Sequence, residues 1–187
     1  MSDPSLRAFI ASITGWLSEA GIDYMVAGSF ASTLHGRPRS TQVVDIVMDT
    51  TEAALRCFLD RVPEETVHVD AGSALEALRR RDMFNLIHLE TGWKAHMIVR
   101  KDRPFSVTEF KRRRMTRWLG LNVAVASPED VILSKLEWSK MAGGSERQRN
   151  DITGVLASNE GALDTEYMAK WVARLGLEGE WSAVQTG

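Results

Sequence analysis

The first feature of the sequence that could carry chemistry is an acidic strand. The segment TQVVDIVMD, residues 41–49, predicts a strand that contains Asp45 and Asp49. Residues 43, 45, 47 and 49 of a strand share one face. A metal ion for phosphoryl transfer is held by carboxylates from such a face and one from a neighbouring strand. Four residues of strand span about 13 Å, so Asp49 is too distant to share a metal ion with Asp45.

A second feature precedes this strand and suits an anion. Gly28 lets the backbone approach a ligand closely, and Ser29 begins a predicted short helix whose first amides point outward. The turn RPRST, residues 37–41, adds Arg37 and Arg39 nearby in the sequence. Their guanidinium groups can help to neutralise a phosphate chain. This order of elements favours a site for a triphosphate.

These residues carry a resemblance to a known family. The segment YMVAGSFASTLHGRPRSTQVVDIVMD resembles the opening motif of the nucleotidyltransferase superfamily, which is Gly-Ser followed by Asp-x-Asp on a strand. Two later segments resemble, more narrowly, small bacterial nucleotidyltransferases similar to those of abortive-infection toxin–antitoxin systems. They are FNLIHLETGWKAHMIVRKDRPFSVTEFKRRR and SPEDVILSKLEWSKMAGGSERQRNDITGVL. The resemblance covers roughly residues 20–160.

The resemblance implies transfer of a nucleoside monophosphate from an NTP to an acceptor, with Mg²⁺ or Mn²⁺ as the cofactor. In the family, two acids on one strand hold two metal ions, and a third acid activates the acceptor hydroxyl. In this chain the first acid aligns with Val43, the second is Asp45, and the third aligns with His96. Asp45 is therefore the candidate metal ligand, Asp45 and His96 are the candidate catalytic residues, and Val43 is a degenerate position.

The resemblance also implies nucleotide binding by residues other than the acids. These residues are Gly28, Ser29, Arg39, Thr41 and Lys135. Lys135 matches a lysine that would face the phosphates, and Asp151 matches an acid of the following helix. The alternative for Lys135 and Asp151 is an exposed helix lysine and a surface salt bridge, each worth under about 1 kcal/mol.

Three interpretations of the altered acids stay open. A single carboxylate is a weak magnesium site, so His96 would be a neutral, hydrogen-bonded residue of a degenerate pocket. Histidine is acceptable to manganese, zinc or nickel, so Asp45 and His96 could hold such a metal. Transfer could also persist through Asp45 with a metal that the nucleotide carries in. We expect a nucleotidyltransferase-like protein with impaired or altered chemistry that retains nucleotide binding.

A rival function rests on a basic cluster. The segment FKRRRMTR, residues 110–117, gathers five Lys and Arg side chains. It could bind RNA or a protein partner, which would make the chain a non-catalytic module of the toxin–antitoxin type. Such a cluster is also typical of a solvated helix end. The acceptor, whether RNA, protein or small molecule, is left open.

The elements that must position these residues follow from hydrophobic periodicity. Helices are expected at residues 2–21, 29–36, 50–62, 73–82, 106–114, 127–143, 146–159 and 164–177. Strands are expected at 23–28, 41–49, 83–90 and 93–100, and a strand or hairpin at 117–126. Predicted caps are Ser2 or Asp3, Thr50 or Thr51, Ser106 with Glu109, and Ser127 followed by Pro128. Trp138, Trp171 and Trp181 are expected to pack between helices.

The expected fold is α/β (α+β) of the nucleotidyltransferase type, a mixed sheet flanked by helices with a helical C-terminal part. Residues 1–126 would form the core, 127–178 a helical part of the same unit, and 179–187 a tail. The net charge of −2 provides no global basic field for nucleic acid. The single cysteine excludes an internal disulfide framework and a cysteine-based zinc site. No apolar run approaches the roughly 20 residues that span a bilayer, so we expect a cytoplasmic protein without a membrane partner.

Overall fold

The structure is a computed structural model that describes residues 4–185, and it divides into two compact units. The first unit comprises the chain up to Val26 together with Thr41–Val125. The second comprises Ala27–Ser40 together with the chain from Ala126 onward. The hydrophobic pattern suggested a change of character after residue 126 but did not separate residues 27–40 from the strands on either side. The predicted caps Ser2 and Asp3 lie outside the described residues.

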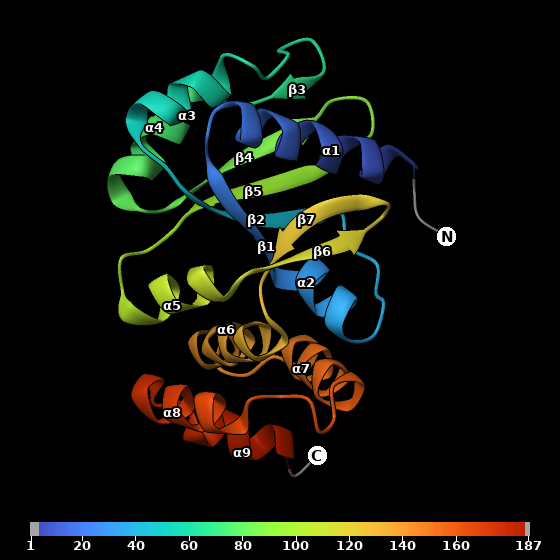
Figure 1. The fold of residues 1–187 in the computed structure, drawn as a ribbon, viewed down its shortest axis with the longest axis vertical. Helices are drawn as coiled ribbons and strands as arrows, with labels where there is room; N and C mark the ends of the chain where they lie inside the picture. Colours follow the sequence, from blue (N-terminus) through green and yellow to red (C-terminus); the bar gives the residue numbers. More distant parts are fainter. Residues whose placement is uncertain (1–3, 186–187) are drawn as a thin grey trace. The chain divides into compact units, whose positions relative to one another are not determined.

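A seven-stranded mixed sheet forms the centre of the first unit (Figure 1). In the described chain its strands are β1 (Asp23–Ala27), β2 (Val43–Asp49), β3 (Val67–His68), β4 (Met83–His88), β5 (Lys94–Val99), β6 (Arg114–Trp118) and β7 (Leu121–Val125). Their order is β3-β4-β5-β2-β1-β7-β6. The pairs β2–β5 and β1–β7 are parallel, whereas β3–β4, β4–β5 and β6–β7 are antiparallel. The mixed sheet with its helices confirms the predicted fold class.

Four helices belong to the first unit: α1 (Pro4–Glu19), α3 (Glu52–Leu59), α4 (Ala71–Arg80) and α5 (Pro104–Arg112). The apolar face predicted for α1 is buried as expected and consists of Leu6, Phe9, Ile10, Ile13 and Leu17. Helix α1 packs against α3 and β7, and α4 packs against α3, β4 and β5. The core of this unit therefore lies between the sheet and these helices.

The two faces of β2 and β5 differ in burial. Val44, Ile46 and Met48 of β2 are completely buried, and they pair in register with Ala95, Met97 and Val99 of β5, which are buried as well. The intervening residues of both strands are only half-buried or exposed. Because side chains alternate along a strand, one face of this strand pair faces the core and the other carries Asp45 and His96.

The second unit is helical in its described residues. It contains α2 (Gly28–His35), α6 (Pro128–Met141), α7 (Glu146–Ser158), α8 (Thr165–Leu175) and α9 (Glu178–Gln185). Helix α2 packs against α6 and α7, and α8 and α9 pack against α6 (Figure 1). The predicted N-cap of α6 is confirmed, because the Ser127 hydroxyl accepts from the amide of Asp130 at 3.2 Å. Thr51 caps α3 in the same way through the amide of Ala54.

Three expectations for helices were wrong. Ser106 does not cap α5, because the helix already begins at Pro104 with Arg103 as its N-cap residue. Proline suits a first helical turn, since it lacks the amide hydrogen that would be unpaired there. Ser106 lies inside the helix, where its hydroxyl accepts from Arg103 Nε at 2.9 Å.

The expected tail forms helix α9, and Trp138 does not pack between helices. Two acidic residues in the first turn of α9, Glu178 and Glu180, favour a helix start. Leu177 is buried just before it, which fixes the chain against the other helices. Trp171 is buried as expected, whereas the Trp138 side chain is 61% exposed. Among the described residues, no helix is both long and apolar enough to cross a membrane.

Candidate functional site

In the first unit, the parallel pairing of β2 and β5 places Asp45 directly opposite His96. Asp45 Oδ1 and His96 Nδ1 are 2.9 Å apart, with the two side chains 23% and 33% exposed respectively. An ionised carboxylate only accepts hydrogen bonds, so Nδ1 donates and Nε2 of a neutral ring is left as an acceptor. The two candidate catalytic residues are therefore partners of one another.

The residues around this pair offer little to a divalent cation. Val43 pairs in register with Lys94, two residues before His96 on the same face of β5. Asn85 of β4 lies opposite His96 on its other side. Asp49 is bound elsewhere, because its Oδ2 is 3.1 Å from Arg100 Nη2. Within residues 4–185, no group of three or more His, Cys, Asp and Glu side chains could hold a metal ion.

Thr41 supports the start of the acidic strand. Its hydroxyl accepts a hydrogen bond from the amide of Val43 at 3.3 Å. Such a contact within two residues is a local turn interaction that fixes the direction in which a strand begins. Thr41 therefore fixes the backbone at Val43, where β2 begins.

In the second unit, the start of α2 has the features of an anion site. Gly28 has a φ of 58°, a left-handed conformation that favours glycine. The residue before it, Ala27, has no side chain that could cap the helix. The first amides of α2 are therefore not satisfied by an N-cap side chain, and helix starts attract negative charge. The Ser29 hydroxyl in this first turn accepts a hydrogen bond from Arg39 Nη2.

Arg39 and Lys135 converge on one carboxylate of α7. Arg39 Nε donates to Oδ1 and Oδ2 of Asp151 at 2.9 and 3.2 Å, and Lys135 Nζ lies 2.7 Å from Oδ2. The Lys135 and Asp151 side chains are only 5% and 7% exposed. Lys135 also donates to Gln148 Oε1 at 3.0 Å. The expectation of an exposed lysine and a surface salt bridge was therefore wrong, because the pair is buried.

The charges around Asp151 also set its proton affinity. Burial by itself would raise the pKa of the Asp151 carboxyl. Hydrogen bonds and positive charge from Lys135, and then from Arg39, outweigh that effect and hold the pKa below its ordinary value. Asp151 is thus an anion at neutral pH, and two of the predicted nucleotide-binding cations already neutralise it.

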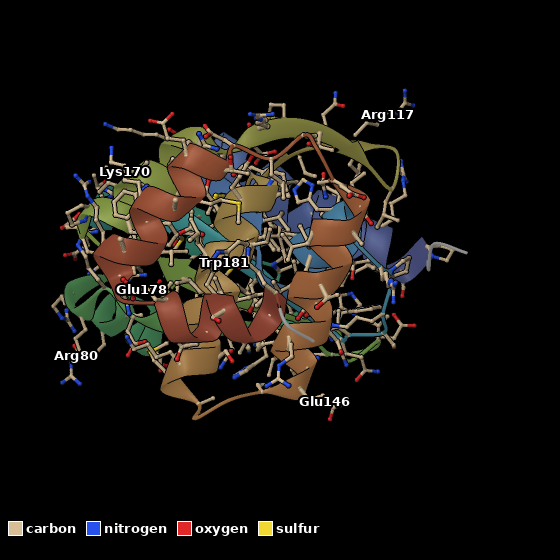
Figure 2. All side chains as sticks on the ribbon, turned by 90° about the horizontal axis from the view of Figure 1, so that it is seen from below. Arg80, Arg117, Glu146, Lys170, Glu178 and Trp181 are labelled. Carbon is tan, nitrogen blue, oxygen red and sulfur yellow. The ribbon has the colours of Figure 1, made fainter. Side chains whose placement is uncertain are left out.

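The basic segment 110–117 is divided between α5 and β6. Arg113 lies over the Phe110 ring at 4.2 Å and is 3.3 Å from Asp23, so it serves the packing of the first unit. Arg117 on β6 points away from its strand in Figure 2. In the sheet order β6 is an edge strand, and its Met115 is 67% exposed.

Solved structures share this fold across most of the chain. An antigenic nucleotidyltransferase-like protein from Paracoccidioides brasiliensis matches with a TM-score of 0.59 and 16% identity, over 98% of this chain and 93% of that one. ANT(2″)-Ia in complex with adenylyl-2″-tobramycin matches with a TM-score of 0.62 and 13% identity, over 91% and 99%. The lincosamide antibiotic adenylyltransferase LnuA, lincomycin-bound, matches with a TM-score of 0.55 and 11% identity, over 82% and 96%. This chain has the nucleotidyltransferase fold.

Sequence comparison is less informative than comparison of structures. No protein-family model matches the sequence, and no curated protein matches it. At identities of 11–16% the solved structures establish the nucleotidyltransferase fold and leave the activity to be argued from side chains. Sequence reasoning singled out Asp45, His96, Arg39 and Lys135, whose roles remain predictions. It did not single out Gln148, the partner of Lys135, since a glutamine on a polar helix face carries no distinctive signal.

Proposed function

We propose that this chain binds a nucleotide and lacks the two-metal transfer reaction that the family resemblance implies. The observation that carries the proposal is the composition of the half-exposed face of β2 and β5. Near Val43, which stands where the second acid would be, that face offers one carboxylate, Asp45, which is hydrogen-bonded to His96. The other carboxylate of the face, Asp49, lies at the far end of β2 and is bound to Arg100. Lys94 adds a positive charge on the same face.

These residues do not fit a pair of magnesium ions. Magnesium is bound through oxygen ligands in nearly octahedral geometry, and two ions need several carboxylate oxygens between them. One carboxylate, one imidazole and a neighbouring ammonium group do not supply that ligand set. We therefore assign no metal-dependent step to this face and treat Asp45–His96 as a hydrogen-bonded pair of a degenerate pocket.

Nucleotide binding is assigned to the second unit. The left-handed Gly28 and the first amides of α2 suit a phosphate, and the Ser29 hydroxyl is held in place by Arg39. The Arg39 guanidinium donates through Nε to Asp151 and through Nη2 to Ser29, so it can orient both. Lys135 acts through Asp151 as a positioning residue, because it is buried against that carboxylate.

Calorimetric titration of ATP in the presence of EDTA tests this assignment. Arg39→Ala should weaken ATP binding by about tenfold, the loss expected for one charge-assisted hydrogen bond to phosphate. Asp151 keeps Lys135 as its partner in this variant, so the fold should survive, which circular dichroism checks. The matched control is Arg149→Ala, which removes an exposed arginine from α7. ATP binding too weak to detect at millimolar concentration, or equal losses in both variants, would refute the assignment.

One observation favours a second candidate, the interaction module. Edge strand β6 carries exposed Arg114, Met115 and Arg117, a combination of apolar surface and positive charge beside unpaired backbone groups. An exposed edge of this kind can accept a strand from a partner protein. A chain that binds no ATP, yet loses a partner when Met115→Lys is introduced, would support this candidate instead.

A further inference from the structure

A cleft in the second unit carries positive charge that the proposed nucleotide site does not use. It has a volume of about 640 Å³ and lies between residues 37–39 and helix α7. Its charged and amide lining comes from Arg37, Arg39, Glu146, Arg147, Asn150 and Asp151. All of these residues belong to the same compact unit.

The walls of the cleft are held together by close backbone packing. A Cβ atom added to Gly36 would lie 2.8 Å from backbone atoms of Gly154 and Val155, so the chain runs directly against α7 at this point. A Cβ atom added to Gly154 would lie 3.3 Å from the amide nitrogen of Arg37. Asn159 Nδ2 donates to the carbonyl of His35 at 2.7 Å, just before this contact. The segment that carries Arg37 and Arg39 is therefore fixed to the helix that carries Arg147.

The charges of the cleft do not balance. The Asp151 carboxylate is already paired with both Arg39 and Lys135, so these three side chains together leave one positive charge in excess. Arg37 and Arg147 add two more, and both residues are exposed. Within the part of the chain that the structure describes, neither arginine side chain has a hydrogen bond or ion pair. Glu146 is the opposing carboxylate, and Figure 2 shows it at the outer start of α7, where it points away from the helix.

The lining chemistry selects the kind of anion. Guanidinium groups bind phosphate oxygens through paired hydrogen bonds, and an amide such as that of Asn150 adds a further donor. Among the residues that the structure describes, the lining contains no aromatic side chain on which a base could stack. From Glu146 to Thr153 the helix advances about 10 Å, which is longer than a single phosphate group. A protein that contacts phosphates but not bases binds the backbone of a nucleic acid independently of its sequence.

We propose that this cleft binds the phosphodiester backbone of a nucleic-acid strand through Arg37 and Arg147. Asn150 donates to the same backbone, and Arg39 forms the inner wall. The inference goes beyond the nucleotide site proposed above, which uses Gly28, Ser29, Arg39 and Lys135: the cleft shares Arg39 with that site but adds Arg147, and it assigns Arg37 to the nucleic-acid backbone. Since base stacking is absent, binding should depend strongly on salt and weakly on sequence.

Fluorescence anisotropy with a fluorescein-labelled, single-stranded RNA of 12 nucleotides tests the proposal on the full chain. Arg147→Glu and Arg37→Glu should each weaken binding by about tenfold and lower the slope of log K against log salt by about one. Arg149→Glu changes the same charge on the same helix outside the lining of the cleft, so it should weaken binding by less than about threefold. Arg117→Glu on β6 should have a similarly small effect.

The outcomes separate the cleft from its rivals. Equal losses in Arg147→Glu and Arg149→Glu would show attraction to overall charge and would overturn the proposal. A large loss of RNA affinity in Arg117→Glu alone would show that RNA binds at edge strand β6 instead of the cleft. Undetectable RNA binding by the wild type at 50 mM salt would refute the proposal. ATP titration of Arg147→Glu distinguishes the two sites. Unchanged ATP binding with weakened RNA binding supports the cleft, whereas loss of both would assign the cleft to the nucleotide instead.

Discussion

Asp151 is the residue on which the charges of the second unit converge. Its carboxylate accepts from Arg39 and Lys135, and the Lys135–Asp151 pair is almost inaccessible to water. A buried ion pair gains little net stability over an apolar pair, because both charges lose their hydration. Removal of one partner is costly, since the other charge is then buried without compensation. The Arg39–Asp151–Lys135 network therefore fixes the positions of these side chains more than it raises the free energy of unfolding.

Asp151→Asn should destabilise the protein by about 3 kcal/mol, because it leaves the Lys135 ammonium buried without a full counter-charge. The measurement is urea unfolding at pH 7, followed by circular dichroism. The double variant Lys135→Met with Asp151→Asn removes that charge as well and should be more stable than Asp151→Asn alone. If the free energy of unfolding of the double variant fell by the sum of the two single-variant losses, Lys135 and Asp151 would not be a coupled pair.

The lowered pKa of Asp151 predicts how stability depends on pH. A carboxyl whose pKa is lower in the folded than in the unfolded state stabilises the fold above the unfolded pKa, here close to 3.8. This contribution is lost as the pH falls further, through the folded pKa. The stability difference between the wild type and Asp151→Asn should therefore be constant from pH 7 to about pH 5 and shrink below about pH 4. A difference that is independent of pH down to pH 3 would contradict the ionised, paired state.

Residue identities were easier to predict than residue contacts. Asp45 and His96 were both singled out from the sequence, but their hydrogen bond follows from the parallel register of β2 and β5. That register depends on how two strands meet that are separated in the chain by α3, β3, α4 and β4, and no local pattern specifies it. The burial of Lys135 could not be predicted either, because it needs the packing of α2 and α7 against α6.

At the scale of elements, the contact between residue 36 and α7 determines the geometry of the second unit. Gly36 has a φ of −141°, which any residue can adopt, so its importance lies in the missing Cβ atom. That atom would lie 2.8 Å from backbone atoms of Gly154 and Val155. Backbone atoms of a helix cannot move aside as easily as the end of a flexible side chain. The absence of a side chain at this position lets the turn that carries Arg37 and Arg39 rest on the helix.

Gly36→Ala should destabilise the protein by about 2 kcal/mol, the cost of overpacking a tight contact. The matched control is Gly15→Ala in the interior of α1, where an added Cβ atom meets nothing within 4 Å. That change should stabilise the protein by about 0.5–1 kcal/mol, since alanine has the better helix propensity. Thermal unfolding of the two variants measures both effects, and a neutral Gly36→Ala would show that the turn does not depend on the contact.

Element types were largely predictable because the apolar pattern is periodic. The buried face of α1 and the hairpin strands β4 and β5 follow directly from such spacing. A helix boundary was predicted wrongly where the prediction relied on a short polar motif. The Ser106–Glu109 pattern resembles a capping box, but Pro104 begins the helix earlier. The region of α9 was predicted as a tail because it lies at the chain terminus. In the structure its eight residues form a helix that buries none of its side chains.

At the scale of the whole molecule, the distribution of charge matters more than its sum. The net charge of −2 gave no reason to expect a nucleic-acid partner. The cleft at Arg37 and Arg147 is nevertheless locally positive, because the fold brings residues 37–39 next to α7. Composition reports only the total, so a local site of this kind is visible only after folding.

The order of the sheet also lay beyond the sequence pattern. Strand β2 lies between β1 and β5, and β7 pairs in parallel with β1. The resemblance implied a nucleotidyltransferase-type sheet, and the solved structures of that fold agree with it over most of the chain. That Val43 and His96 stand where the family would carry acids remains a prediction from the resemblance.

We propose that this chain binds nucleotide phosphate at the start of α2 and does not bind the metal ions of the transfer reaction. The most direct test of this claim is calorimetric titration of ATP, with EDTA, Mg²⁺ or Mn²⁺, into the wild type and into the double variant Val43→Asp with His96→Asp. We predict that neither metal changes the affinity of the wild type for ATP. In the double variant, which restores three carboxylates, Mg²⁺ should strengthen binding at least about tenfold. Metal-strengthened binding by the wild type, with Asp45→Ala abolishing it, would contradict the claim and show that Asp45 and His96 form a working metal site.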